Sequence, residues 1–339
     1  MKLLIAIPAL NEEESISSII ERCVAAKKHI TAEAGVSDVE ITVVSDGSTD
    51  RTVEYAKKYT DRIKLIIFEK NKGYGAAIKE AWAQSDAELL SFIDADGTCD
   101  PMFFVALCQL LKRENAHVVL GARMHKNSLM PKIRRLGNGI FATLLTLFSK
   151  KKVGDCASGM RVVRRSCLNS LYPLPDGLHF TPAMSARAIL SSELTIREID
   201  MPYKEREGRS KLHVIKDGLR FLRIILVTAF LYQPARIIGL FAIVIGVSSS
   251  WLMVMPLRYY IENHSLLEWM QYRFFIFLLG STITLLLIFT SFIARKVVWM
   301  TLSDSDPEKE SLELVGRVVR SKLFYVIPAL LFLAGSALL

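Results

Sequence analysis

The sequence predicts an α/β fold with a doubly wound, mostly parallel sheet, followed by an amphipathic interface helix and transmembrane α-helices. Residues 1–122 alternate short apolar runs with helical stretches, a pattern typical of a parallel sheet covered by helices on both faces. The 339 residues are 51% hydrophobic and 23% charged, with a mean hydropathy of +0.30. This composition and the long uncharged segments in the last third indicate a soluble domain joined to a membrane domain.

The strands of the predicted sheet are short, continuous apolar runs, as buried parallel strands usually are. These runs are residues 3–7, 41–45, 63–68, 89–93 and 118–121, and a further strand is expected at residues 194–199, where the chain returns to a mixed α/β pattern. The first run is too short for a signal peptide, and acidic residues follow it at once, so we interpret it as a strand. Asn11 with Glu14 predicts a capping box at one helix start, and Asp100 before Pro101 predicts another start.

Polar side chains follow several of these strands. Asn11, Asp46, Lys72 and Asp94 each stand just after a predicted strand end, and ligands of doubly wound sheets bind at the carboxyl ends of the strands. Two glycines beside Lys72 open a helix, whose N-terminus could let the backbone approach a nucleotide. Asp46 could accept a hydrogen bond from a nucleobase or ribose, although turn and capping roles explain these residues equally well.

The acidic pair Asp94 and Asp96 is the strongest single indication of chemistry. The two carboxylates lie one residue apart, where a buried apolar run opens into a loop. Such a compact set of hard oxygen ligands suits Mg²⁺ or Mn²⁺ that carries a substrate diphosphate. An ordinary solvated acidic loop is the competing interpretation, and the basic and membrane segments downstream weigh against it.

The charge is strongly basic, and its distribution is uneven. The net charge is +9 with a pI near 9.3, and residues 123–165 hold eleven Lys or Arg but one acidic residue, Asp155. With membrane segments present, this excess favours phosphorylated substrates and anionic lipid over nucleic acid as partners. The five cysteines form no close pair, which indicates reduced thiols and no disulfide framework or zinc site.

Residues 211–230 predict an amphipathic helix in a membrane interface, since Lys216, Arg220 and Arg223 lie off an apolar stripe with three- and four-residue spacing. The stripe consists of Leu212, Ile215, Leu219, Leu222 and Leu226. A surface helix packed on the soluble domain is the alternative interpretation.

The expected membrane spans are residues 237–257, 274–294 and 323–339. The first two carry no charge over 21 residues, and a helix of that length covers about 31 Å, enough for a bilayer core. The third has 17 residues and no polar tail, which indicates a truncated chain or an unusually placed terminus.

We therefore expect a soluble domain at residues 1–210, an interface helix at 211–232 and a membrane domain at 233–339. Basic residues follow the second span and precede the third, so the soluble domain is expected on the cytoplasmic face of a multi-pass cell-membrane protein. These basic residues are Arg295, Lys296, Arg317, Arg320 and Lys322.

Several motifs resemble one family in their order and spacing. They are Pro8-Ala9-Leu10-Asn11-Glu12, Ser45-Asp46-Gly47-Ser48-Thr49-Asp50, Asn71-Lys72-Gly73-Tyr74-Gly75 and Asp94-Ala95-Asp96-Gly97. Together they resemble the family 2 glycosyltransferases, whose nucleotide-sugar-binding domain has the GT-A fold. Asp155-Cys156-Ala157-Ser158-Gly159-Met160-Arg161 and Arg206-Glu207-Gly208-Arg209-Ser210-Lys211-Leu212 are similar to the polyprenyl-phosphate branch. That branch includes dolichol-phosphate mannosyltransferases and undecaprenyl-phosphate sugar transferases.

The resemblance implies a role for each matching residue. The residues implied for donor binding are Pro8, Asn11, Glu12, Asp46, Lys72, Asp94 and Asp96, the last two also as ligands of Mg²⁺ or Mn²⁺. The residues implied for the acceptor phosphate are Arg123, Arg134, Asn138 and Arg209, and those implied for catalysis are Asp155, Asp94 and Arg123. Asp96-Gly97-Thr98-Cys99 departs from the glutamine-containing continuation of mannosyl transferases, which leaves the sugar open.

The expected function is the metal-dependent transfer of a sugar, with inversion, from a nucleotide sugar to a polyprenyl phosphate. A homo-oligomer is also expected. A phosphate monoester is mostly a dianion at pH 7, so Asp155 would orient groups or remove a residual proton. Transfer to a neutral lipid hydroxyl such as diacylglycerol is the alternative and requires a true general base. A second alternative is a membrane protein that binds a nucleotide sugar and catalyses no reaction. A missing QxxRW element disfavours a polysaccharide synthase, and a missing glycine-rich triphosphate loop disfavours a nucleotidyltransferase.

Overall fold

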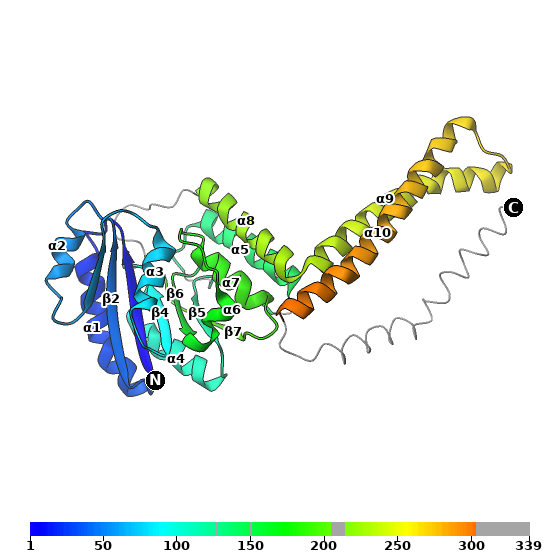
Figure 1. Ribbon diagram of the computed structural model, residues 1–339. Coiled ribbons are helices and arrows are strands. Elements are labelled where there is room, and N and C mark those ends of the chain that lie inside the picture. Colours follow the sequence, from blue (N-terminus) through cyan, green and yellow to red (C-terminus); the bar gives the residue numbers. More distant parts are fainter. Residues whose placement is uncertain (126–127, 150, 205–213, 303–339) are drawn as a thin grey trace. The chain divides into compact units, whose positions relative to one another are not determined.

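The computed structural model describes residues 1–125, 128–149, 151–204 and 214–302 (Figure 1). The chain divides between Gln233 and Pro234 into two compact units. Arg209 and the predicted span at residues 323–339 lie outside the described residues.

The first unit is built on a seven-stranded sheet with the order β3-β2-β1-β4-β6-β5-β7. The strands are β1 (Lys2–Ala9), β2 (Asp38–Asp46), β3 (Lys64–Phe68), β4 (Leu89–Ile93), β5 (Val118–Ala122), β6 (Met160–Arg164) and β7 (Ile196–Asp200). The six expected strands are present, and the neighbours β3-β2-β1-β4 and β5-β7 pair in parallel. The predicted doubly wound, mostly parallel α/β fold is confirmed.

β6 was not expected, because Arg161 and Arg164 leave only two adjacent apolar residues, Val162 and Val163, between them. It runs antiparallel between β4 and β5, and its first residue, Met160, pairs with Ile93 at the end of β4. The amino end of β6 therefore lies at the same edge as the carboxyl ends of β4 and β5. This reversal brings the segment from Asp155 to Gly159, which precedes β6, to the edge where ligands of such sheets bind.

Helices cover both faces of the sheet (Figure 1). On one face α1 (Ile16–Glu33), the short helix η1 (Pro101–Phe103) and α4 (Phe104–Arg113) bury one side of β1 and β4. On the other face α3 (Tyr74–Ala83) and α7 (Phe180–Leu190) pack around Phe92 of β4. The rings of Trp82, Phe92 and Phe180 lie 5.8–6.2 Å apart, a spacing typical of packed aromatic side chains. The remaining short helices are α2 (Thr52–Lys57), η2 (Arg165–Cys167) and α6 (Leu168–Leu171).

One of the two predicted helix starts is correct. Asp100 directly precedes Pro101, and its side chain accepts a hydrogen bond from the Met102 amide, as the side chain of an N-cap residue does. The capping box at Asn11 is wrong, because α1 begins five residues later, at Ile16. Asn11 has a φ of 48° and turns its side chain toward the loop after β2, so it does not continue into a helix.

α5 (Lys132–Phe148) and α8 (Val214–Tyr232) complete the first unit, and α8 packs on α5 and α7. Phe221 and Ile225 lie on the buried face of α8. The predicted apolar stripe faces outward, with Ile215 81% and Leu219 63% exposed. α8 thus combines a packed face with an exposed apolar face; Leu212 of the predicted stripe lies outside the described residues.

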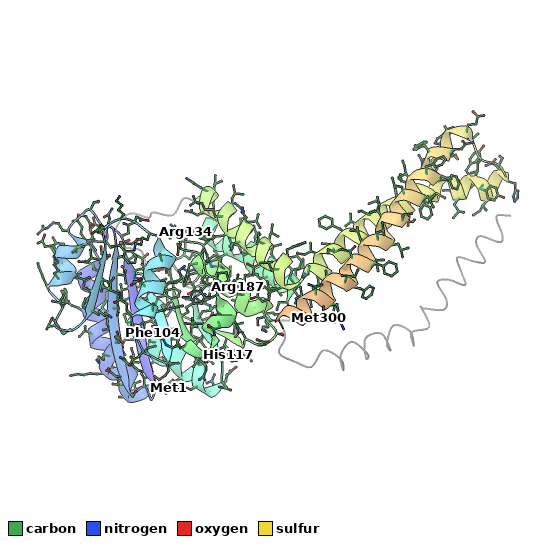
Figure 2. All side chains as sticks on the ribbon, in the orientation of Figure 1. Met1, Phe104, His117, Arg134, Arg187 and Met300 are labelled. Atoms are coloured by element: carbon green, nitrogen blue, oxygen red, sulfur yellow. The ribbon has the colours of Figure 1, made fainter. Side chains whose placement is uncertain are left out.

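The second unit contains α9 (Pro234–Asn263), the short helix η3 (Glu268–Met270) and α10 (Gln271–Leu302). Small residues bring α9 and α10 together, since a Cβ added at Gly280 would lie 2.5 Å from the Cβ of Ser249. Large side chains project along the whole length of both helices (Figure 2). The expected spans at 237–257 and 274–294 fall inside these two helices, which are long and apolar enough to cross a membrane.

Candidate active site

The loops at one edge of the sheet hold most of the candidate residues. They follow β1, β2, β3, β4, β5 and β7 and precede β6, because β6 runs in the opposite direction. Predicted residues gather there in three groups: the loops after β1, β2 and β3, the acidic loop after β4, and the segment around Asp155.

The loops after β1 and β2 are cross-linked by hydrogen bonds. The Thr49 amide donates to Oδ1 of Asn11 at 2.8 Å, and the Ser48 hydroxyl accepts from the Asn11 amide at 3.1 Å. The Glu12 amide donates to the Thr52 hydroxyl at 2.8 Å. Pro8 lies within β1 and is buried. These contacts give the expected nucleoside-binding edge a fixed shape.

Asp46 joins this edge to the loop after β3. Its buried carboxylate accepts hydrogen bonds from the backbone amides of Lys72 at 2.7 Å and Gly73 at 3.0 Å. The Lys72 ammonium lies 4.3 Å from the centre of the Phe68 ring. Asp46 and Lys72, far apart in sequence, therefore form one connected wall.

The N-terminus of α3 is not open to a nucleotide, and that expectation is wrong. The amides of Gly75 and Ala76 in its first turn both donate to the carbonyl oxygen of Asp176, at 2.5 and 3.1 Å. The ammonium of Lys79 adds an ion pair to the Asp176 carboxylate at 2.6 Å. A segment of the protein thus occupies the donors that a diphosphate would need.

Asp94 and Asp96 are oriented by different parts of the chain. The Tyr74 hydroxyl donates to Oδ1 of Asp94 at 2.6 Å, whereas Oδ1 of Asp96 accepts from the hydroxyl and amide of Thr98, at 2.7 and 3.2 Å. From α1, the Arg22 guanidinium donates to the carbonyl of Cys99 at 2.8 Å and holds the same loop. Burial and the Asp94 charge raise the pKa of Tyr74 well above its usual value, so Tyr74 stays a donor.

This pair of carboxylates fits a divalent cation that a substrate completes. Among the described residues, no group of three or more His, Cys, Asp or Glu side chains could hold a metal ion by itself. Mg²⁺ usually binds one or two carboxylates together with substrate phosphates and water, so a two-carboxylate set matches its chemistry. Asp94 and Asp96 would hold such an ion through oxygen.

Asp155 lies in a saturated hydrogen-bond network. The Arg123 side chain donates to both carboxylate oxygens, through Nε at 2.7 Å and Nη2 at 2.9 Å. The Asn138 amide group and the backbone amides of Arg123 and Ala157 add donors at 3.0–3.2 Å. Burial would raise the pKa of Asp155, which is fully buried, but the charge and hydrogen bonds of Arg123, together with the charge of Arg161, lower it below the usual value.

Glu198 of β7 supports this network and did not stand out in the sequence. Both of its carboxylate oxygens accept from the Gly154 amide at 2.9 Å, which fixes the turn just before Asp155. Burial raises the pKa of Glu198 above its usual value. Glu198 reaches the Gly154 amide because β7 is the strand next to β5. In the sequence, a single acidic residue within a predicted strand gave no indication of this contact.

Tyr203 lies beside Arg123 in the site. Burial raises the pKa of Tyr203 above its usual value, and the positive charge of Arg123 partly opposes this rise. The guanidinium of Arg123 also lies 5.5 Å from the Tyr203 ring centre. Sequence reasoning missed this side chain beside Arg123. A tyrosine shortly after the end of β7 was the available signal.

α5 contributes to the site on one side and exposes apolar residues on the other. Asn138 is buried against Asp155, and Arg134 lies in the first turn of α5 (Figure 2). The outward face of α5 and the preceding loop carry exposed apolar side chains at three- to seven-residue spacing. These are Leu129, Ile133, Leu136, Ile140 and Leu147. α8, which packs on α5, carries its own outward stripe of exposed apolar side chains.

Comparison with known proteins identifies a family. The profile of Glycosyl transferase family 2 matches residues 4–171. A dolichyl-phosphate hexose transferase of Haloferax volcanii is 32% identical over 222 residues, which cover 64% of this chain and 89% of that protein. An undecaprenyl-phosphate 4-deoxy-4-formamido-L-arabinose transferase of Photorhabdus laumondii is 29% identical over 259 residues, 75% of each chain. A low-salt glycan biosynthesis hexosyltransferase of Haloferax volcanii is 30% identical over 72% of this chain, which spans only 59% of that relative.

The fold has solved counterparts. Glucosyl-3-phosphoglycerate synthase from Mycobacterium tuberculosis, in complex with Mn²⁺, UDP-glucose and phosphoglyceric acid, superposes with a TM-score of 0.54 at 20% identity. The match covers 67% of this chain and 79% of that one, and at this identity it concerns the GT-A fold. The resemblance predicted from the motifs is confirmed, because the profile matches the segment that holds β1 to β6 and a 32% identical relative is matched over 89% of its length. The chain belongs to glycosyl transferase family 2 and is a glycosyltransferase.

Proposed function

We propose that this protein transfers a sugar from a nucleotide-sugar donor to a polyprenyl phosphate in a membrane, with the help of a divalent metal ion. The observation that carries the proposal is the state of Asp155. Its carboxylate is buried, accepts five hydrogen bonds and has a lowered pKa. A group in that state holds Arg123 in place and is a poor proton acceptor near pH 7. Such a site suits an acceptor that is already an anion.

The donor lies along the edge formed by the loops after β1, β2 and β3. Asn11, Glu12 and Asp46 shape this edge through their hydrogen bonds, and Asp94 and Asp96 face the diphosphate. The relatives of known structure bind Mn²⁺ together with UDP or UDP-glucose, which supports a divalent ion at the two aspartates. A bound Mg²⁺ or Mn²⁺ neutralises the charge of the leaving nucleoside diphosphate.

The acceptor phosphate lies at Arg123 and Arg134, and planar guanidinium groups suit this contact because they bind phosphate oxygens in pairs. A phosphate oxygen attacks the anomeric carbon, the bond from that carbon to the diphosphate breaks, and the nucleoside diphosphate leaves with the bonding electrons. The new bond forms opposite the broken one, so the anomer is inverted. The polyprenyl-phosphate relatives support this choice of acceptor.

The lipid tail of the acceptor lies along the exposed apolar stripes of α5 and α8, which would otherwise face water. Lys216 and Arg223 flank the stripe of α8, an arrangement that favours an anionic membrane surface. α9 and α10 supply the membrane spans, and Arg295 and Lys296 favour a cytoplasmic position for the site. That the protein forms a homo-oligomer stays a prediction.

Transfer to a neutral hydroxyl is less well supported. A hydroxyl acceptor such as diacylglycerol needs a base with a pKa near the working pH. Asp155, the candidate for that role, has its pKa shifted in the opposite direction.

The purified full-length protein tests the proposal when UDP- and GDP-sugars are combined with undecaprenyl phosphate, dolichyl phosphate, undecaprenol or diacylglycerol. Mass detection of the lipid products should show a glycosylated lipid phosphate that requires Mg²⁺ or Mn²⁺ and is lost in Asp96→Ala. Product from undecaprenol or diacylglycerol but not from the phosphates would refute the choice of acceptor. Metal-independent product, or full activity in Asp96→Ala, would refute the metal site.

A further inference from the structure

Tyr74 and Gly159 enclose the carboxylate of Asp94 from two sides. The Tyr74 hydroxyl, at the first residue of α3, donates to Oδ1 at 2.6 Å. On the other side, a Cβ built at Gly159 would lie 1.8 Å from Oδ2 of Asp94. Only a residue without a side chain leaves room for the carboxylate in this position. The two contacts come from segments that are 20 and 65 residues distant in sequence.

Asp94 and Asp96 therefore depend on the fold in different ways. The Thr98 contacts that orient Asp96 arise within its own loop. The contacts that orient Asp94 require α3, β4 and the start of β6 to be correctly placed, because Tyr74 and Gly159 lie on different elements. The ring of Tyr74 is itself fixed, since it packs edge-on against Phe92 with ring centres 6.2 Å apart.

We propose that Tyr74 is a positioning residue that sets the Asp94 carboxylate for the divalent ion and the donor diphosphate, with Gly159 as the opposite wall. This inference rests on the proposed function, because it assumes that Asp94 binds the ion. Tyr74 stands in the segment Lys72-Gly73-Tyr74, whose backbone amides bind Asp46. It thus connects the wall that faces the nucleoside with the carboxylate that faces the diphosphate.

Two effects of the Tyr74 hydroxyl act on metal affinity with opposite signs. A donated hydrogen bond withdraws charge from the carboxylate and weakens its bond to a cation. The same hydrogen bond holds the carboxylate in one orientation, so that binding does not have to order it. Loss of such outer partners of metal ligands typically weakens metal affinity about 10- to 100-fold, which indicates that orientation outweighs charge withdrawal.

The test compares two tyrosines with the same chemistry. Tyr74→Phe removes the hydroxyl and keeps the ring that packs on Phe92. Tyr59→Phe is the matched control, because the Tyr59 hydroxyl donates to the Glu21 carboxylate at 2.7 Å on an exposed surface of α1. Mn²⁺ binding to the full-length protein is measured by electron paramagnetic resonance of free Mn²⁺, with UDP and, in a parallel series, with GDP.

We expect Tyr74→Phe to weaken Mn²⁺ binding at least about tenfold, while Tyr59→Phe binds Mn²⁺ as the unmodified protein does. Gly159→Ala provides a second variant. The three atoms nearest to the added methyl group all belong to the Asp94 carboxylate, so this carboxylate has to move. Gly159→Ala should weaken Mn²⁺ binding by at least as much as Tyr74→Phe, with thermal melting without metal showing an intact fold.

The outcomes separate this inference from the proposed function. If the unmodified protein binds Mn²⁺ and Tyr74→Phe binds it equally well, the positioning role is refuted while the metal site stands. If Tyr74→Phe melts at a much lower temperature than the unmodified protein, the Mn²⁺ affinity of Gly159→Ala decides whether the positioning of Asp94 matters for metal binding. If the unmodified protein binds no Mn²⁺ with either nucleotide, the metal part of the proposed function fails and the role of Tyr74 fails with it.

Discussion

The guanidinium of Arg123 faces the carboxylate of Asp155 edge to edge, with Nε and Nη2 each donating to a different oxygen at 2.7 and 2.9 Å. Asp155 has no exposed surface. Removing one member of a buried pair leaves the other charge without compensation, which typically costs about 3–5 kcal/mol. A substitution of Asp155 can therefore distinguish a positioning role from a role in proton transfer only if it keeps a hydrogen-bond partner for Arg123.

Asp155→Asn is the substitution that makes this separation. The asparagine keeps the size of the side chain and one acceptor for Arg123, but it removes the charge and turns one acceptor into a donor. We expect kcat/KM for the lipid phosphate to fall about 100-fold, as a small misplacement of a substrate-binding group does, with measurable activity remaining. Steady-state kinetics with saturating metal check this. Activity that falls to background in a correctly folded variant would instead indicate an essential base.

The dependence of activity on pH gives a second test. The pKa of Asp155 lies below its usual value, so this carboxylate stays charged throughout pH 5–8. The acceptor phosphate changes from monoanion to dianion near pH 6, so kcat/KM should rise with pH through about 6. The midpoint of this rise in kcat/KM should lie at the same pH in Asp155→Asn when initial rates are measured from pH 5 to 8. A midpoint that moves in the variant would assign the titration to Asp155.

The exposed stripe of α8 predicts a difference between long and short acceptors. Leu219 is 63% exposed, so Leu219→Glu should change the free energy of unfolding by no more than about 0.5 kcal/mol. The added charge faces the lipid, and activity on undecaprenyl phosphate in anionic vesicles should fall about tenfold. Activity on a short, water-soluble prenyl phosphate should be unchanged and serves as the control. An equal loss on both acceptors would contradict a membrane-facing role.

Close packing of α9 on α10 predicts sensitivity at Gly280. A Cβ at this position would lie 2.5 Å from the Ser249 Cβ, so Gly280→Val has to separate the two helices. Overpacking of this kind typically costs about 1–3 kcal/mol, and thermal melting in detergent should show it. Leu285→Val on the exposed side of α10 is the control and should melt like the unmodified protein. Equal melting of all three proteins would argue against close packing here.

The sequence predicted the parts of the fold that have a local pattern. Five apolar strands and the two long uncharged segments within α9 and α10 were located from hydropathy, and Asp94 with Asp96 from their place after β4. β6 escaped because Arg161, which is fully buried and bonded to protein carbonyls, interrupts its apolar pattern. The contacts of Tyr74 with Asp94 and of Asp155 with Arg123 escaped for another reason: they join segments separated by 20 and 32 residues, and spacing carries no sign of them.

The reversed strand has a consequence for how the chain acquires its shape during synthesis. β4 and β5 each pair with β6 and do not pair with each other in the described sheet. Until Arg164 has left the ribosome, the growing polypeptide holds the four strands β3-β2-β1-β4 and a separate β5, because β7 is synthesised after β6. Backbone groups along β4 and β5 are then unpaired. Open edges of this kind attract strands of other chains. The interval before β6 emerges is thus the stage at which aggregation threatens most and at which a chaperone would help most.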